Sequence, residues 1–165
     1  MHPQRNRYPV IFTVLSLLHT QAIASQAVTA GWVEKAVLYP SGTVFHAKLD
    51  TGAKTTSINA VDVEFFQRDG KRWSKFKITN RDHETITIEA PLVREATIKR
   101  HFGKRQKRPV IMLDICIGNV RKKEEVNLVD RANLNYQLLV GRNFLKGDLL
   151  IDSGSTYRLS PGCPD

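Results

Sequence analysis

Asp50 is the residue of this sequence best suited to chemistry, and it lies in the run LDTGA that spans 49–53. Two carboxylates can hydrolyse an amide when they share one proton, since like charges about 3 Å apart cannot both ionise easily. Such a pair needs two Asp-bearing loops to meet, and Gly52 allows their backbones to approach closely. A small hydroxyl residue such as Thr51 can tie one loop to the other. The same letters also suit a surface turn, because Asp and Gly are common in turns.

The segment QLLVGRNFL, at 137–145, favours a catalytic role for Asp50. An apolar run enters Gly141, and the residues from Arg142 to Lys146 favour a short helix closed by a glycine. With LDTGA, this segment resembles the active-site segments of retropepsin-type aspartic proteases. More closely, KLDTGAKTTSINA, VNLVDR and YQLLVGRNFLKGDLLID resemble a family of bacterial retropepsin-like aspartic endopeptidases, often labelled "ATP-dependent zinc protease". The resemblance extends over nearly the whole chain after the first 31 residues.

This resemblance implies a closed, mostly β fold with one catalytic Asp per chain, Asp50. Two chains would pair as a homodimer, with Thr51 hydrogen-bonding across the dimer axis and Gly52 permitting the close approach. A peptide or protein substrate would lie extended across the dimer cleft. The residues that would support the loop without transferring protons are Ala53, Gly141 and Arg142.

The zinc and the ATP of the family label have no counterpart in the motifs of this sequence. Three histidines follow residue 25, His46, His83 and His101, and none belongs to an H-E-x-x-H helix. A phosphate-binding G-x-x-x-x-G-K-[ST] loop is also missing from the sequence. We therefore expect no metal and no cofactor. His46 lies on the same side of its strand as Asp50 and could tune the dyad, but a solvated strand histidine is the favoured interpretation.

A second run, DSGS at 152–155, imitates a catalytic loop. In an enzyme with two lobes, a second Asp loop needs its own apolar-Gly segment further along the chain. Only 13 residues follow Asp152, so there is no room for one. We interpret 152–155 as a strand end and turn, which leaves Asp50 as the one catalytic Asp and predicts a dimer.

The remaining pattern is that of an all-β protein. Apolar alternation predicts many short strands, and Phe45, Ala47 and Leu49 share one strand face. Turn signals predict hairpins at Asp69-Gly70 and Gly118-Asn119. With the short helix near the C-terminus, the expected fold is a closed, retropepsin-like β-barrel.

The N-terminus has the pattern of a secretory signal peptide. Two arginines precede the apolar run VIFTVLSLL at 10–18, and small residues follow at Ala22 and Ala24. The run is shorter than the roughly 20 apolar residues of a membrane span. We expect cleavage after residue 24, a single domain over 25–165, and a periplasmic or secreted protein that meets the membrane only during export.

The chain is basic, with a formal net charge of +9 from 25 basic and 16 acidic residues. Without Arg5 and Arg7 the charge is 23 minus 16, or +7. No aromatic-interleaved basic motif of an RNA-binding module is present, so we expect no nucleic-acid partner. The basic stretch from Arg94 to Arg108 is either a substrate-covering flap or a solvated loop. The two cysteines, Cys116 and Cys163, form a disulfide or remain thiols; their spacing does not decide between these.

Three functions remain as hypotheses. The first is an exported, homodimeric aspartic endopeptidase that activates water with two copies of Asp50. The second is a non-catalytic peptide-binding or regulatory module that keeps the fold but stays monomeric. The third, weaker hypothesis is a protein that binds an anionic surface through its positive charge.

Overall fold

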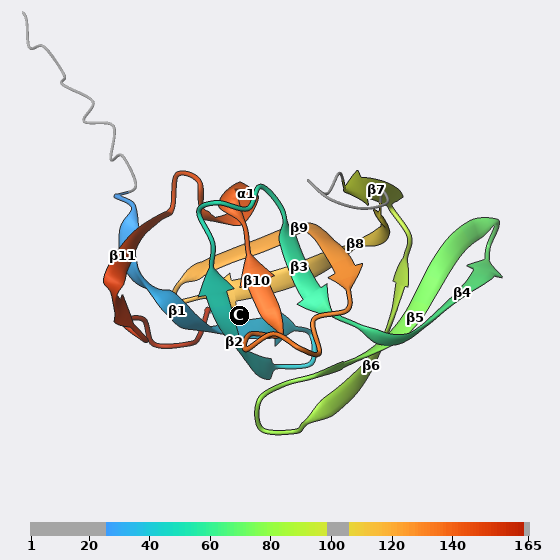
Figure 1. The fold of residues 1–165 in the computed structure, drawn as a ribbon, viewed down its shortest axis with the longest axis horizontal. Coiled ribbons are helices and arrows are strands. Elements are labelled where there is room, and N and C mark those ends of the chain that lie inside the picture. Colours follow the sequence, from blue (N-terminus) through green and yellow to red (C-terminus); the bar gives the residue numbers. More distant parts are fainter. Residues whose placement is uncertain (1–25, 99–105, 164–165) are drawn as a thin grey trace, which may run out of the picture.

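A computed structural model describes residues 26–98 and 106–163 (Figure 1). The predicted signal peptide and His101 lie outside this part of the chain. The described residues form eleven strands and one short helix, and among them no helix is long and apolar enough to cross a membrane. The elements are β1 (Val28–Tyr39), β2 (Thr43–Leu49), β3 (Thr56–Asn59), β4 (Val61–Arg68), β5 (Lys71–Thr79), β6 (Thr85–Pro91), β7 (Arg94–Ile98), β8 (Gln106–Ile117), β9 (Val120–Val129), β10 (Leu138–Val140), α1 (Arg142–Leu145) and β11 (Leu149–Thr156).

Most strands form one sheet that closes on itself. Its order is β11-β1-β2-β10-β3-β9-β8-β7, and β1 also pairs with β8. This extra pairing closes a barrel of six strands, β1, β2, β10, β3, β9 and β8, and leaves β11 and β7 as edges. The predicted all-β barrel with one short helix is therefore confirmed.

Strand β2 shows how the barrel positions Asp50. Phe45, Ala47 and Leu49 are all at most 3% exposed, whereas the residues between them are only half-buried. Because side chains alternate along a strand, one face of β2 is fixed in the core up to its last residue. Asp50 follows directly, so its backbone starts from a rigid point.

The segment from β4 to β6 forms a separate three-stranded antiparallel sheet that extends from the barrel (Figure 1). Its first hairpin turns at Asp69-Gly70, where both residues have positive φ. Gly118, also at positive φ, lies in the turn between β8 and β9. Both predicted hairpins are present.

The run 152–155 lies inside β11, which corrects its interpretation as a strand end. The β1–β11 register shifts at this point and pairing then resumes at Val33 and Thr156, so the strand continues. Both Asp152 oxygens accept local hydrogen bonds, one from Gly154 N–H and one from the Ser155 hydroxyl. These bonds, the Ser155 bond first, lower the pKa of Asp152. Asp152 therefore stabilises a bulge in the strand.

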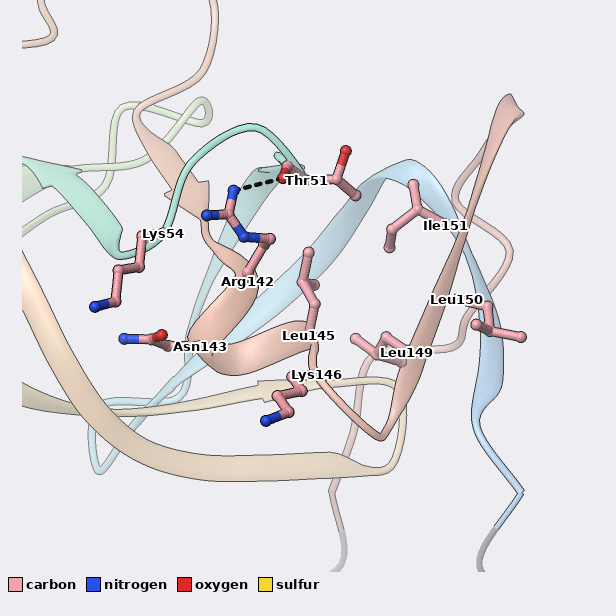
Figure 2. A pocket seen from close by; sticks show the side chains of 9 residues that line it. All are labelled: Thr51, Lys54, Arg142, Asn143, Leu145, Lys146, Leu149, Leu150 and Ile151. Atoms are coloured by element: carbon pink, nitrogen blue, oxygen red, sulfur yellow. Dashed lines mark hydrogen bonds between the residues drawn. The ribbon is translucent and has the colours of Figure 1, made fainter.

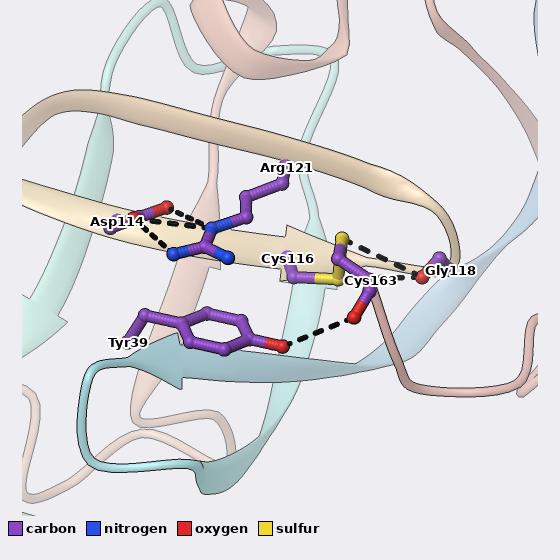
Figure 3. Close-up of a disulfide and its surroundings, with 6 residues drawn as sticks. All are labelled: Tyr39, Asp114, Cys116, Gly118, Arg121 and Cys163. Atoms are coloured by element: carbon purple, nitrogen blue, oxygen red, sulfur yellow. Dashed lines mark hydrogen bonds and ion pairs between the residues drawn. A yellow bond between two sulfur atoms is a disulfide. The ribbon is translucent and has the colours of Figure 1, made fainter. Parts of the chain in front are cut away.

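Cys116 and Cys163 form a disulfide, which decides the alternative that their spacing left open. The bond joins β8 to the C-terminal tail across 47 residues of sequence. Figure 3 shows it beside Tyr39, whose hydroxyl donates to the Cys163 carbonyl oxygen at 3.4 Å. The tail is thus fixed to the outside of the barrel.

Replacing both Cys116 and Cys163 by Ala is expected to lower the free energy of unfolding by about 4 kcal/mol, the chain-entropy value for a loop of this length. Urea unfolding of the oxidised wild type and the double variant measures the difference. Wild-type protein kept in reductant is the control and should match the variant. Equal midpoints for all three samples would contradict a stabilising disulfide.

Candidate active site

The Asp50 loop is a tight turn at the end of β2. Asp50 N–H donates to Val140 O at 2.8 Å, and Ala53 N–H donates back to Asp50 O at 3.2 Å. The Asp50 Oδ1 atom accepts the Gly52 N–H at 2.9 Å. Its side chain remains 26% exposed, with Lys48 Nζ 3.8 Å from Oδ2. The turn therefore holds one carboxylate oxygen and leaves the other at the surface.

The start of α1 holds the same loop from beneath. Arg142 N–H donates to Ala53 O at 2.9 Å, and Asn143 N–H donates to Lys54 O at 3.0 Å. These are N–H groups of a first helical turn, which have no partner within the helix. The short helix thus begins where the loop carbonyls need donors. The sequence pattern of the helix did not reveal this contact.

Arg142 adds a side-chain clamp to this contact. One of its guanidinium nitrogens, Nη1, donates to both Thr51 O at 2.8 Å and Gly52 O at 2.9 Å. The clamp fixes the two peptide groups after Asp50. Thr51 itself is exposed, as a residue must be if it is to contact another molecule.

Gly141 lies where the two segments touch. A Cβ atom at this position would be 2.7–2.8 Å from backbone atoms of Thr55, closer than real Cβ contacts come. The Gly141 N–H also donates to Thr56 Oγ1 at 3.1 Å. The backbone angle does not require glycine at this position, since a φ of −93° is open to any residue. The close approach of the two backbones is what requires it.

A buried carboxyl, Glu124 on β9, completes the support. The Thr56 hydroxyl donates to Glu124 Oε1 at 2.5 Å while accepting the Gly141 N–H. Burial raises the pKa of Glu124, and the Thr56 hydroxyl and Lys122 act in the opposite direction. Sequence reasoning missed Glu124, since only the pairing of β9 beside β3 brings it to the loop.

The two segments around Asp50 and Gly141 are thus packed as one unit, and the family comparison agrees with this. Residues 29–160 match the sequence model of the RimB-like family, described as retropepsin-like aspartic endopeptidase RimB. This chain belongs to the RimB-like family. The family expected from the motifs is therefore confirmed, with an aspartic-protease-like fold.

Relatives of this RimB-like chain include longer proteins. A protein named probable alpha-L-glutamate ligase from Shewanella pealeana is 32% identical over 116 residues, which is 68% of this chain but 25% of that protein. One of the same name from Desulfotalea psychrophila is 32% identical over 109 residues, 64% of this chain and 24% of the relative. This chain therefore spans about a quarter of the length of these relatives.

A solved structure has the same fold. The protein Lpg0085 of Legionella pneumophila, of unknown function, is 31% identical, with a TM-score of 0.69. The match covers 81% of this chain and 98% of that one. The RimB-like fold therefore also occurs as a protein of about this domain's size.

Arg131 is the last residue of the run VNLVDR, one of the segments that carry the family resemblance. Its Nε donates to Tyr136 O at 3.1 Å and its Nη1 to Ser57 Oγ at 3.2 Å. Burial lowers the pKa of Arg131, as does the charge of Arg108, whereas Asp50 raises it. Arg131 therefore lies within electrostatic reach of the Asp50 carboxylate.

His46 contacts Tyr157, whereas a histidine that tunes the Asp50 pair would have to contact Asp50. Its Nδ1 atom lies 2.8 Å from the Tyr157 hydroxyl oxygen, and the two rings meet edge to face. Burial, followed by the charge of Arg81, lowers the pKa of His46, while Asp82 raises it. The histidine thus joins β2 to the segment after β11. Among the described residues, no group of three or more His, Cys, Asp or Glu side chains could hold a metal ion.

The basic stretch Arg94–Arg108 begins and ends in paired strands. β7 pairs antiparallel with the start of β8, from Arg94↔Val110 to Ile98↔Gln106, and residues 99–105 lie outside the described part. A cavity of about 450 Å³ is lined by β7 and by Lys54 and Thr55, which follow the Asp50 loop. The β7 arm of this stretch therefore lies across this cavity from the residues that follow the Asp50 loop.

Proposed function

We propose that this chain is an exported aspartic endopeptidase that acts as a homodimer. The observation that carries the proposal is the Asp50 loop, held by Gly52, Val140 and Arg142 so that one carboxylate oxygen stays exposed. Two copies of Asp50 would hold a water molecule between them. One carboxylate would take a proton from the water as it attacks the scissile carbonyl carbon. The other would donate its proton to the carbonyl oxygen.

The second carboxylate must come from a second chain. Asp152, in the one similar run, is engaged by Ser155 and Arg158. A single carboxylate has no partner with which to share the proton. The two Asp50 side chains of a symmetric dimer supply that partner. Cleavage ends when the proton taken from water passes to the leaving amine, the C–N bond breaks, and the new carbonyl returns its proton to the pair.

Acidic peptides are the substrates that the charges favour. Lys48 Nζ lies 3.8 Å from Asp50 Oδ2, and Arg131 is in electrostatic reach of the same carboxylate. The name probable alpha-L-glutamate ligase, which similar longer proteins carry, also points to α-linked glutamate. We therefore take glutamate-rich peptides as the substrate class, because cations beside the cleft would hold carboxylate side chains.

The disulfide supports export. Disulfides persist in oxidising compartments and are rare in the cytosol. Cys116–Cys163 thus agrees with the signal-peptide pattern of residues 1–24. The proposed location is the periplasm or the outside of the cell.

A non-catalytic peptide-binding module is the second candidate. It is favoured by the relatives, in which the matched region is a quarter of a protein named for a ligase activity. Such a module would bind acidic peptides as a monomer and leave them intact.

A cleavage assay separates the two candidates. Quenched fluorescent peptides of oligo-glutamate, oligo-alanine and oligo-lysine are incubated with the protein between pH 4 and 8, and products are identified by mass spectrometry. Cleavage of the glutamate peptide by a dimeric protein supports the peptidase. Binding of that peptide without cleavage, by a strict monomer, supports the module.

Arg131→Gln is expected to lower kcat/KM for the oligo-glutamate peptide about 10- to 100-fold, the range for losing a hydrogen bond to a charged group. Cleavage of a neutral peptide should change far less, because that peptide offers no carboxylate. The measurement is the ratio of the two kcat/KM values, which a general loss of structure would leave unchanged. Arg131→Lys, which keeps the charge, is the control. An unchanged ratio in Arg131→Gln would show that Arg131 does not select acidic residues.

A further inference from the structure

We propose that Glu124 is a positioning residue for the Asp50 loop, and that it holds the loop only while it keeps its proton. The inference rests on the proposed function and deepens it, because it names a group outside the Asp50 pair whose protonation controls cleavage. Glu124 lies on β9, which pairs with β3. It acts on the loop through two intermediate groups, the Thr56 hydroxyl and the Gly141 N–H.

Two hydrogen bonds connect Glu124 to the segment that supports the loop. The Thr56 hydroxyl donates to Glu124 Oε1 at 2.5 Å and accepts the Gly141 N–H at 3.1 Å. The residue after Gly141 donates its own N–H to Ala53 O, at the end of the Asp50 loop. Glu124 is the acceptor that fixes the direction of the hydroxyl proton, and a lone pair of the same oxygen is thereby left for Gly141. Without that acceptor the hydroxyl would be free to rotate.

The second carboxyl oxygen of Glu124 decides which protonation state suits this arrangement. Oε2 is buried and has no hydrogen-bond partner among the described residues. The distance from Thr56 Oγ1 to Oε1 fits both a neutral acid and a carboxylate. An unpaired hydroxyl at Oε2 costs less than an unpaired charge, so the buried position favours the neutral acid. Burial accordingly raises the pKa of Glu124, against the opposing effects of the Thr56 hydroxyl and Lys122.

The groups around Glu124 do little to offset its burial. Lys122, two residues earlier on β9, favours the ionised form, but its Nζ atom already lies 2.5 Å from Asp148 Oδ2. Leu113, the residue paired with Glu124 on β8, carries no charge. The cation of α1, Arg142, is directed to a carbonyl oxygen of the Asp50 loop, as Figure 2 shows. No neighbouring element therefore supplies a free cation for an ionised Glu124 in the part of the chain that the structure describes.

Ionisation of Glu124 would release the loop. A buried charge is costly unless water or a cation reaches it, so the ionised side chain would turn toward Lys122 and solvent. Thr56 then loses its acceptor, and Gly141 loses a fixed partner. Because the pKa of Glu124 is raised in the folded protein, the stability that it contributes is complete below the ordinary glutamate pKa and is lost as pH rises through the raised one. Cleavage by Asp50 falls over the same pH range.

Thermal unfolding between pH 4 and 8 tests the role of the proton. Glu124→Gln imitates the neutral acid, since its side-chain oxygen can still accept the Thr56 hydroxyl. The midpoint of Glu124→Gln minus that of wild type should rise by about 2 °C or more from pH 4 to pH 8. Glu125→Gln is the matched control, because the hydrogen bond from Arg94 lowers the pKa of Glu125, and its midpoint difference should fall with pH. A difference for Glu124→Gln that stays constant or falls overturns the inference.

Cleavage kinetics test whether the proton acts on the Asp50 loop. The kcat of Glu124→Gln is divided by that of wild type at each pH, which removes the titration of the Asp50 pair that both proteins share. This ratio should rise at least about 3-fold from pH 4 to pH 8, with little change in KM. Glu124→Leu fills the position but accepts no hydrogen bond, so it should lower kcat about 10-fold at every pH. A ratio that does not change with pH, or a folded Glu124→Leu with wild-type kcat, overturns the inference.

The failure of this inference differs from the failure of the proposed function. An active wild type whose kcat ratio and midpoint difference do not change with pH leaves the peptidase intact and overturns the inference. If the protein cleaves no peptide, the NMR signal of the Gly141 amide still tests the coupling. In Asp50→Asn this signal should shift with pH as Glu124 titrates, and the shift should disappear when Glu124→Gln is added. A shift that is missing from Asp50→Asn, or that persists in the double variant, overturns the inference.

Discussion

Asp50→Asn is expected to lower kcat for peptide cleavage at least about 1,000-fold, the contribution of positioned proton transfer. The amide cannot take a proton from water, and it cannot hold the proton that two carboxylates share. Asn can still accept the Gly52 N–H through its side-chain oxygen, so the loop should keep its shape. The measurement is cleavage of the best peptide substrate, with thermal unfolding to confirm that the variant is folded.

Asp152→Asn is the matched control, because its run resembles the Asp50 loop and, in the part of the chain that the structure describes, its carboxylate binds residues close in sequence. It should retain activity within a few-fold of wild type. A folded Asp50→Asn with more than a tenth of wild-type activity would show that Asp50 is not the proton carrier. An equal loss of cleavage activity in both variants would show that the effect of Asp50→Asn is not specific to the Asp50 loop.

Mixed dimers test whether the two carboxylates come from two chains. Wild-type and Asp50→Asn chains are mixed at fixed total concentration and left to exchange partners. With one Asp50 required from each copy, activity falls with the square of the wild-type fraction, to about one quarter when half of the chains are variant. A linear fall, to one half, would mean that each chain works alone.

The sequence predicted the barrel and the position of Asp50 because both depend on local patterns. Alternation over Phe45, Ala47 and Leu49 fixes which face of β2 is buried, and a turn must follow where it ends. The helix was expected over Arg142 to Lys146 and ends one residue earlier, at Leu145. Such boundaries depend on the cap geometry, which residue types specify weakly.

The parts that could not be predicted depend on pairing between distant strands. Glu124 supports the loop because β9 lies beside β3, and nothing near it in the sequence marks it as different from other strand carboxylates. The disulfide needs Cys163 to return to β8, which spacing alone does not specify. Asp152–Ser155 stays within β11 because Gly31 of β1 allows the bulged strand to approach closely. Long-range register, and not residue type, decides all three.

The sequence gives the number of charged residues, but it does not show where their charges lie in the folded protein. The basic stretch Arg94–Arg108 suggests a strongly positive surface, yet Arg94 pairs with Glu125, and Lys107 lies 3.7 Å from Glu95. Part of its charge is thus neutralised by neighbouring strands. Two cations that interact with Asp50 come from other segments, since Arg131 follows β9 and Lys48 belongs to β2. The local charge at the site is therefore a product of the fold.

Gly141→Ala is expected to be the most damaging change outside the Asp50 loop. The added Cβ would lie 2.7–2.8 Å from the Thr55 backbone, which is held between the loop and β3. Neither side can move without breaking the Gly141–Thr56 hydrogen bond or the Asn143–Lys54 hydrogen bond. We expect a loss of about 3 kcal/mol of stability, the upper end of typical overpacking costs. We also expect loss of cleavage, because the displaced loop carries Asp50.

The matched control is Gly42→Ala, at a glycine with φ of +74° and no atom within 4 Å of the added Cβ. That substitution should cost about 1 kcal/mol through its backbone conformation alone and leave kcat unchanged. Thermal unfolding and kcat are measured for both variants at a temperature where both are folded. If Gly141→Ala loses stability but keeps full kcat, the loop and the helix are not coupled. If Gly42→Ala loses kcat as well, activity follows general stability, and the close contact at Gly141 has no special role in positioning Asp50.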